Sequence, residues 1–203
     1  MKWILLIFFS LILSINVYSQ SNITVQYFGL TAHPFGDYTA EIQPYKLDKK
    51  ARLVANFGGY ISYEKLVWYD ILSVRIKQGI FSDCSAGFMG VSHIGVNVRL
   101  WGNQKHRLSF AIGPALVYRN SWNRFGIYEN RGYWNEREIY SQPTQYKTVL
   151  YACEFEYNYM ISEKVDLSVG FVPGFPNALA LSVGAKFWLN KDFNPRIKLV
   201  RRK

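Results

Sequence analysis

Strict alternation of apolar and polar residues returns about eight times along this chain, in runs of roughly ten residues. The clearest run covers residues 107–119, where one parity is apolar: Leu108, Phe110, Ile112, Leu116 and Tyr118. Successive side chains of a β-strand point to opposite faces, so this run predicts a strand with one apolar face and one small or polar face. A soluble β-sandwich can show the same local pattern, and the rest of the chain has to decide between a sandwich and a membrane barrel.

The chain opens with the features of a secretion signal. Lys2 gives a positive start, residues 3–13 are apolar, and residues 17–19 form a small-residue cleavage site. We therefore expect a signal peptide over 1–19, one domain over 20–190 and a basic tail over 191–203. The tail carries six Lys or Arg residues against Asp192. It is expected to be a solvated end, with contact to anionic lipid or cell-wall polymer as the alternative.

The spacing of the alternating runs predicts the fold. We expect eight strands, over residues 23–34, 52–63, 69–81, 87–100, 107–119, 146–160, 165–172 and 179–189. Short connections alternate with longer ones, as in barrels that have tight periplasmic turns and larger outer loops. Together with export and an aromatic content of 17%, this pattern predicts an all-β, eight-stranded antiparallel up-and-down transmembrane β-barrel with both termini periplasmic. The expected location is the outer membrane of a Gram-negative bacterium, and so narrow a barrel excludes a porin.

The charge of the chain indicates the kind of partner. A formal net charge of +10 favours an anionic partner, and the phosphates of lipopolysaccharide are the nearest ones for an exported barrel. Nucleic acid is excluded in that compartment. We expect lipopolysaccharide and phospholipid as partners, a monomer, and neither a cofactor nor a metal.

Parity also predicts what fills the barrel. Inward-facing cations and carboxylates, which must pair when buried, are expected to form one network: Arg75, Lys77, Arg99, Glu154, Glu156 and Asp166. On the same strand as the two glutamates, the lipid-facing parity is expected to hold Val149, Tyr151, Cys153 and Phe155. Cys84 falls at the outer rim, too far from Cys153 for a disulfide, which needs Cα atoms within roughly 7 Å. Two free thiols are therefore expected.

One group of residues at the outer rim could support chemistry. His33 ends the first strand, and Asp83, Cys84 and Ser85 follow the third, so all four are expected at the same end of the barrel. Acyl transfer needs a nucleophile, a base and a group that orients the base. Cys84 or Ser85 could be the nucleophile, with His33 as the base and Asp83 as the orienting carboxylate. The alternative is structural: Asp and Ser are common turn residues, and a rim histidine is often only solvated.

Several short motifs resemble the lipid A palmitoyltransferase family (PagP), which are eight-stranded outer-membrane acyltransferases. His33 and the segment Phe81-Ser82-Asp83-Cys84 match a His near the end of the family's first strand and an aromatic-x-Asp-Ser element after its third. The segment 119–124 is similar to the family's Arg-Asp-x-Trp-Asn loop start. Phe171-Val172-Pro173-Gly174 is similar to an aromatic-Ile-Pro-Gly strand end. The similarity spans most of the mature chain, although each motif is short.

The resemblance implies transfer of an acyl chain from phospholipid to lipid A. Cys84 stands where the family has a serine, so the thiol or Ser85 would take that role. Arg119, Trp122 and Arg124 would bind the substrate, because guanidinium groups suit phosphate and aromatic rings suit the membrane interface. Pro173, which lacks a backbone donor, would open the strand pairing where an acyl chain enters. The alternative function is a non-catalytic small barrel that serves adhesion, envelope stability or assembly.

Overall fold

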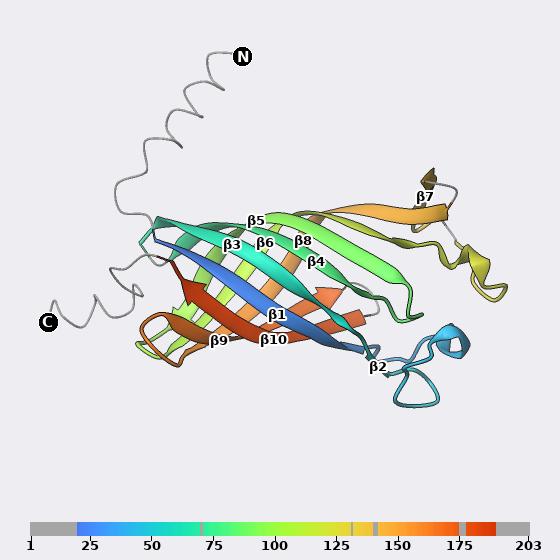
Figure 1. Ribbon diagram of the computed structural model, residues 1–203, viewed down its shortest axis with the longest axis horizontal. Helices are drawn as coiled ribbons and strands as arrows, with labels where there is room; N and C mark the ends of the chain where they lie inside the picture. The colour runs from blue at the N-terminus through green and yellow to red at the C-terminus, as the bar shows by residue number, and fades with distance from the viewer. Residues whose placement is uncertain (1–19, 70, 131, 140–141, 175–177, 190–203) are drawn as a thin grey trace, which may run out of the picture.

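The computed structural model describes residues 20–69, 71–130, 132–139, 142–174 and 178–189, which Figure 1 traces as a single cylinder of strands. The expected signal peptide over 1–19 and basic tail over 191–203 lie outside the described residues. Eight strands form the cylinder: β1 (Ser21–Ala32), β3 (Gly58–Trp68), β4 (Leu72–Ser82), β5 (Phe88–Gly102), β6 (His106–Asn120), β8 (Gln142–Met160), β9 (Val165–Gly174) and β10 (Ala178–Trp188).

Pairing along the cylinder follows chain order, and β10 pairs with β1 to close it. All of these pairings are antiparallel, so the predicted eight-stranded up-and-down barrel is confirmed. Two short strands extend one end: β2 (Leu53–Ala55) pairs with β1, and β7 (Asn135–Ile139) pairs with β8. The sequence pattern predicts one strand over residues 52–63, where the structure has β2 and the first part of β3. Gly58, at φ 149°, separates them because glycine adopts this backbone conformation far more readily than other residues.

The two ends of the barrel differ in their connections. The short connections that follow β3, β5 and β8 lie at the end where β1 begins and β10 finishes. The long connections that follow β1 and β6 lie at the opposite end, which we call the outer end (Figure 1). Tight periplasmic turns and longer outer loops are typical of outer-membrane barrels. The described ends of the chain therefore lie at the periplasmic side, as predicted.

Burial in this barrel is the reverse of that in a soluble protein. Strand β4 shows it most clearly, because its exposed side chains are apolar and its buried ones polar: Val74, Ile76 and Ile80 outside, Ser73, Arg75 and Lys77 inside. The same alternation holds around the wall. Apolar side chains cover far more of the outer surface than is found on water-soluble proteins. Lipid must therefore solvate this surface, which makes the fold that of an outer-membrane β-barrel.

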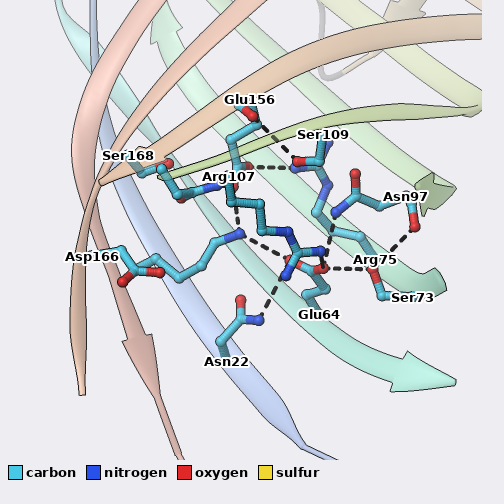
Figure 2. A network of polar contacts seen from close by, with 12 residues as sticks. Asn22, Glu64, Ser73, Arg75, Asn97, Arg107, Ser109, Glu156, Asp166 and Ser168 are labelled. Carbon is cyan, nitrogen blue, oxygen red and sulfur yellow. Dashed lines mark hydrogen bonds and ion pairs between the residues drawn. The ribbon is translucent and has the colours of Figure 1, made fainter. Parts of the chain in front are cut away.

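Paired charges fill the periplasmic half of the interior. Arg75 lies 2.7 Å from Glu154 and 2.6 Å from Glu156, and Lys77 lies 2.6 Å from Glu154, which confirms this part of the predicted network. The sequence did not predict the second centre, at Glu64. Its carboxylate lies 3.0 Å from Lys186 Nζ. A guanidinium nitrogen of Arg107 lies 3.3 Å from the same carboxylate, and Figure 2 shows Glu64 and Arg107 side by side. These residues join β3, β4, β6, β8 and β10 through the barrel axis.

A bulge in the wall corrects one predicted side-chain orientation. Between β6 and β8, the register shifts from Gly113 opposite Ala152 to Ala115 opposite Val149. Pro114 thus faces two residues of β8, because it has no N–H with which to continue the ladder. The shift reverses the parity of β8 above it and places Val149 opposite Ala115, which is buried inside the barrel, so Val149 faces the interior. The prediction that Val149 faces lipid is wrong, whereas Tyr151 and Phe155 are exposed as predicted.

Both cysteines are free, as predicted. Cys84 lies in the turn after β4 at the outer end, and Cys153 lies on the wall strand β8. Within the described part of the chain, no cluster of three or more His, Cys, Asp or Glu residues could hold a metal ion. No helix among the described residues is long and apolar enough to cross a membrane.

Candidate active site

The outer end of the barrel brings together His33 and Cys84, two of the residues proposed from the sequence. The Nε2 atom of His33 lies 3.5 Å from the Sγ atom of Cys84. His33 directly follows β1, and its backbone N–H donates to the carbonyl oxygen of Arg52 at 2.6 Å. The His33 side chain is only 9% exposed. At this separation the imidazole nitrogen can accept the thiol proton, which is the first requirement of a nucleophile and base pair.

Asp83 holds the turn that follows β4. Its Oδ1 atom accepts hydrogen bonds from the backbone of Ser85 (2.9 Å) and Gly87 (2.8 Å), and from the Ser85 hydroxyl (2.8 Å). Its Oδ2 atom accepts a hydrogen bond from the indole N–H of Trp122. This pattern is an Asx-type turn, which fixes the backbone that presents Cys84. The Ser85 hydroxyl is thus bound to Asp83, whereas the Cys84 thiol contacts His33.

The carboxylate beside the imidazole belongs to Asp37, which sequence reasoning missed. Asp37 Oδ2 lies 4.0 Å from His33 Nδ1, on the opposite side of the ring from Cys84. Thr39 donates to Asp37 Oδ1 from its backbone and hydroxyl at 2.8 and 2.7 Å, and Gln43 Nε2 donates to Oδ2 at 2.8 Å. Asp37 is therefore a second carboxylate at the site, at ion-pair distance from the imidazole. The sequence feature that could have indicated this contact is the spacing of His33 and Asp37, four positions apart with a turn at Gly36 (φ 78°) between them.

The Cys84 thiol is protonated at rest. Burial raises the pKa of Cys84 to about 12, and the negative charge of Asp83 acts in the same direction. A thiol with this pKa carries almost no thiolate at neutral pH, so it cannot attack without a base. The contact with His33 supplies a base at the required position.

Below this pair lies a cavity of about 1160 Å³ that His33 and Cys84 both line. Its walls are largely apolar and include Phe28, Phe81, Met89, Val91, Val149 and Ala180. Three of the aromatic residues around it pack as a cluster, with ring centroids 4.5 Å apart between Phe28 and Phe81. Lys77 and Glu154, which form an ion pair, line the cavity farther from the rim. The cavity thus lies between the reactive pair and the ionic network.

The wall beside the cavity is incompletely paired. Strands β8 and β9 pair from Met160 opposite Asp166 up to Phe155 opposite Phe171. Above that point the described residues of β8 form no ladder with β9, and Pro173 pairs only with Leu179 of β10. Residues on both sides of this gap line the cavity, among them Ala152, Val172 and Pro173. Pro173 therefore lies beside this unpaired part of the wall.

The predicted substrate-binding residues of the β6–β8 loop have separate environments. The Arg119 guanidinium lies between two indoles, with its Cζ atom 3.9 Å from the Trp122 ring centroid and 4.4 Å from that of Trp134. It also donates to Gln145 (3.0 Å) and Tyr128 (3.1 Å), so Arg119 organises the loop. Trp122 is buried against Asp83. Of the two predicted phosphate-binding arginines, Arg124 is the exposed one.

Fold and site together define the class of protein: a small outer-membrane β-barrel with a thiol–imidazole pair above an apolar cavity. No family model matches the chain, and no curated protein matches it. Solved structures whose chains fold similarly include the N-terminal β-barrel domain of Pseudomonas aeruginosa OprF. It has 15% sequence identity and a TM-score of 0.44, and the match covers 85% of this chain and 100% of that one.

Two further structures have comparable scores. Neisserial surface protein A (NspA) has 10% identity, a TM-score of 0.46, and coverage of 84% of this chain and 99% of that one. Ail, the attachment invasion locus protein of Yersinia pestis, was solved in complex with the heparin analogue sucrose octasulfate. It has 14% identity, a TM-score of 0.43, and coverage of 84% and 97%. The function of this chain therefore has to be argued from its own site.

Proposed function

We propose that this protein is an outer-membrane acyltransferase that moves an acyl chain from a phospholipid to lipid A of lipopolysaccharide. The observation that carries the proposal is the 3.5 Å contact between His33 Nε2 and Cys84 Sγ at an apolar cavity of about 1160 Å³. A paired nucleophile and base can perform acyl transfer, and a cavity of this size and lining can bury an acyl chain. The motif resemblance to the lipid A palmitoyltransferase family supports the same donor and acceptor.

The first half of the reaction forms an acyl-enzyme. Cys84 gives its thiol proton to His33 Nε2 as the sulfur attacks the ester carbonyl carbon of the phospholipid. The carbon–oxygen ester bond then breaks, and the leaving alkoxide takes the proton back from His33. The products are a thioester on Cys84 and a lysophospholipid. Asp37, beside Nδ1, stabilises the imidazolium that exists between these two proton transfers.

The second half returns the enzyme to its starting state. A hydroxyl group of lipid A gives its proton to His33 and attacks the thioester carbonyl, and the carbon–sulfur bond breaks. The sulfur recovers the proton from His33, and the acyl chain is now an ester of lipid A. The unpaired wall between β8 and β9 supports this scheme, because acyl chains in the membrane could enter the cavity there without crossing water.

The direct test is mass spectrometry of lipid A from cells that carry the gene, lack it, or carry a variant. We expect one additional acyl chain on lipid A when the wild-type gene is present. Cys84→Ala should abolish the addition, and His33→Ala should reduce it by about 10²–10⁴-fold, the usual contribution of a general base. Cys153 also lines the cavity, so the control is Ser162→Ala in the exposed turn between β8 and β9, which should leave the addition unchanged. Identical lipid A from all five strains would contradict the proposal.

A second candidate is a non-catalytic barrel that serves adhesion, envelope stability or assembly. The high pKa of Cys84 and the binding of Asp83 and Arg119 to protein groups favour it, because these features also make a rigid rim. This function predicts that Cys84→Ala leaves lipid A unchanged while altering the stability of the barrel or attachment of the cells.

A further inference from the structure

The connection between β1 and β3, residues 33–57, carries an exposed apolar face that the proposed chemistry does not use. Four large side chains of this loop are between 42% and 64% exposed: Tyr45, Leu47, Leu53 and Phe57. They are held by a small hairpin in which Leu47 N–H donates to Leu53 and Ala55 N–H donates to Tyr45. The loop therefore presents these side chains on a defined surface.

The hairpin has two different faces. Lys46 and Val54 are opposite each other in an antiparallel bridge, which puts residues 45, 47, 53 and 55 on one face. Val54, on the other face, is completely buried. The rings of Tyr45 and Phe57 contact edge to face, with centroids 5.2 Å apart. A monomeric soluble loop would bury such a face, so its exposure indicates a surface with a partner.

This face continues the lipid-facing wall of the barrel. Strand β2 pairs with β1 so that Leu53 lies opposite Ala32 and Ala55 opposite Leu30. Farther down β1, Val25 and Tyr27 are exposed at 48% and 50% as part of the lipid-facing surface. The Tyr27 hydroxyl donates to the backbone of Asn56 at 3.1 Å, which joins the wall to the loop. Exposed apolar side chains thus lie both on the barrel wall and on the hairpin that pairs with it.

The tip of the hairpin is basic. Lys49, Lys50 and Arg52 are exposed there, next to Leu47 and Leu53. Asp48 accepts backbone hydrogen bonds from Lys50, Arg52 and Leu53, so its carboxylate shapes the turn. Three cations beside an apolar face match an amphiphile with anionic head groups.

We propose that the hairpin within residues 33–57 docks on lipid A of the outer leaflet. Tyr45, Leu47, Leu53 and Phe57 would contact its acyl chains, and Lys49, Lys50 and Arg52 would contact its phosphates. This inference goes beyond the acyltransferase proposal and does not depend on it. A barrel that only anchors itself in lipopolysaccharide would use the same surface.

The test measures binding of lipid A to the purified full-length protein in neutral detergent by native mass spectrometry. Lys49→Glu with Lys50→Glu should weaken the apparent affinity by about tenfold or more, because each basic residue at such a surface contributes on the order of a tenfold factor or less. Leu47→Ser with Leu53→Ser should weaken it severalfold. The matched control, Lys105→Glu with Lys164→Glu, makes the same change in net charge at the short-turn end and should stay within about twofold of wild type.

Three other results would each overturn one part of the proposal. Equal affinities for the Lys49/Lys50 variant and its control would overturn the role of the basic tip. An unchanged affinity after the two Leu→Ser substitutions would overturn the role of the apolar face. Displacement of lipid A by an excess of inorganic phosphate would show a free-phosphate site instead of a lipid surface. Circular dichroism of each variant confirms that the barrel has folded, whether or not lipid A is modified in cells.

Discussion

At the scale of single residues, the reactive site combines a predicted contact with one that was not predicted. The approach of His33 to Cys84 follows from the sequence, because the first and third strands of the barrel, β1 and β4, both finish at the outer end. The hydrogen bonds that Asp83 accepts within its own turn did not follow, because an Asp-x-Ser segment at a strand end suits an Asx turn as well as a catalytic carboxylate. Asp37 reaches the imidazole through a loop whose conformation depends on Thr39 and Gln43, and no periodic pattern encodes that.

The pKa of Cys84 predicts how its reactivity depends on pH. In a Cys153→Ala background, alkylation of Cys84 by iodoacetamide should rise about tenfold per pH unit from pH 8 to 11 without a plateau, because the thiolate fraction keeps rising until pH passes the raised pKa. An ordinary thiol levels off near pH 9. The measurement is the alkylation rate, followed by intact-protein mass spectrometry.

The denatured protein provides the control for that experiment. In urea the same thiol loses its burial and its proximity to Asp83, and its rate should level off near pH 9. A plateau near pH 9 in the folded protein would show that Cys84 has an ordinary pKa, and the account of a buried resting thiol would be wrong.

At the scale of elements, period-two alternation predicted the existence of all eight barrel strands but not their registers. Strand β7 was missed because it lies in a loop rich in charged residues, outside the apolar pattern. The bulge opposite Pro114 reversed the parity of β8 above it and placed Val149 inside. Parity is a local property, whereas a bulge depends on the partner strand, so one extra residue reverses every later assignment.

Ion pairs across the interior hold distant strands together, and Glu64 is the residue that shows this best. It is fully buried on β3 and contacts Lys186 of β10, Arg107 of β6 and Asn97 of β5. Glu64→Ala should destabilise the barrel by about 3–5 kcal/mol, because it leaves two buried cations short of a counter-charge. The measurement is the free energy of unfolding in urea, with the protein in lipid vesicles.

An exposed glutamate serves as the comparison for Glu64. Glu163 lies in the turn between β8 and β9, and Glu163→Ala should change the free energy of unfolding by less than about 0.5 kcal/mol. If Glu64→Ala were equally mild, the interior charges would not be what holds the strands together.

At the scale of the whole molecule, the barrel is divided into an ionic periplasmic half and an outer half that contains the apolar cavity. The sequence predicted the lipid-facing exterior and the charged interior, because each is a property of strand faces. It did not predict the cavity, whose volume depends on how side chains from many strands pack. It suggested the gap between β8 and β9 only through Pro173, because loss of pairing depends on the neighbouring strand.

The central claim is that Cys84 carries an acyl chain during turnover, and intact-protein mass spectrometry tests it most directly. The full-length protein is incubated with phospholipid vesicles that contain no lipid A, so that the second half of the reaction cannot proceed. The account predicts a mass increase of one acyl chain, located on Cys84 by peptide mapping, released by hydroxylamine and absent from Cys84→Ala. An unmodified wild-type protein, or an acyl group on any other residue, would contradict it.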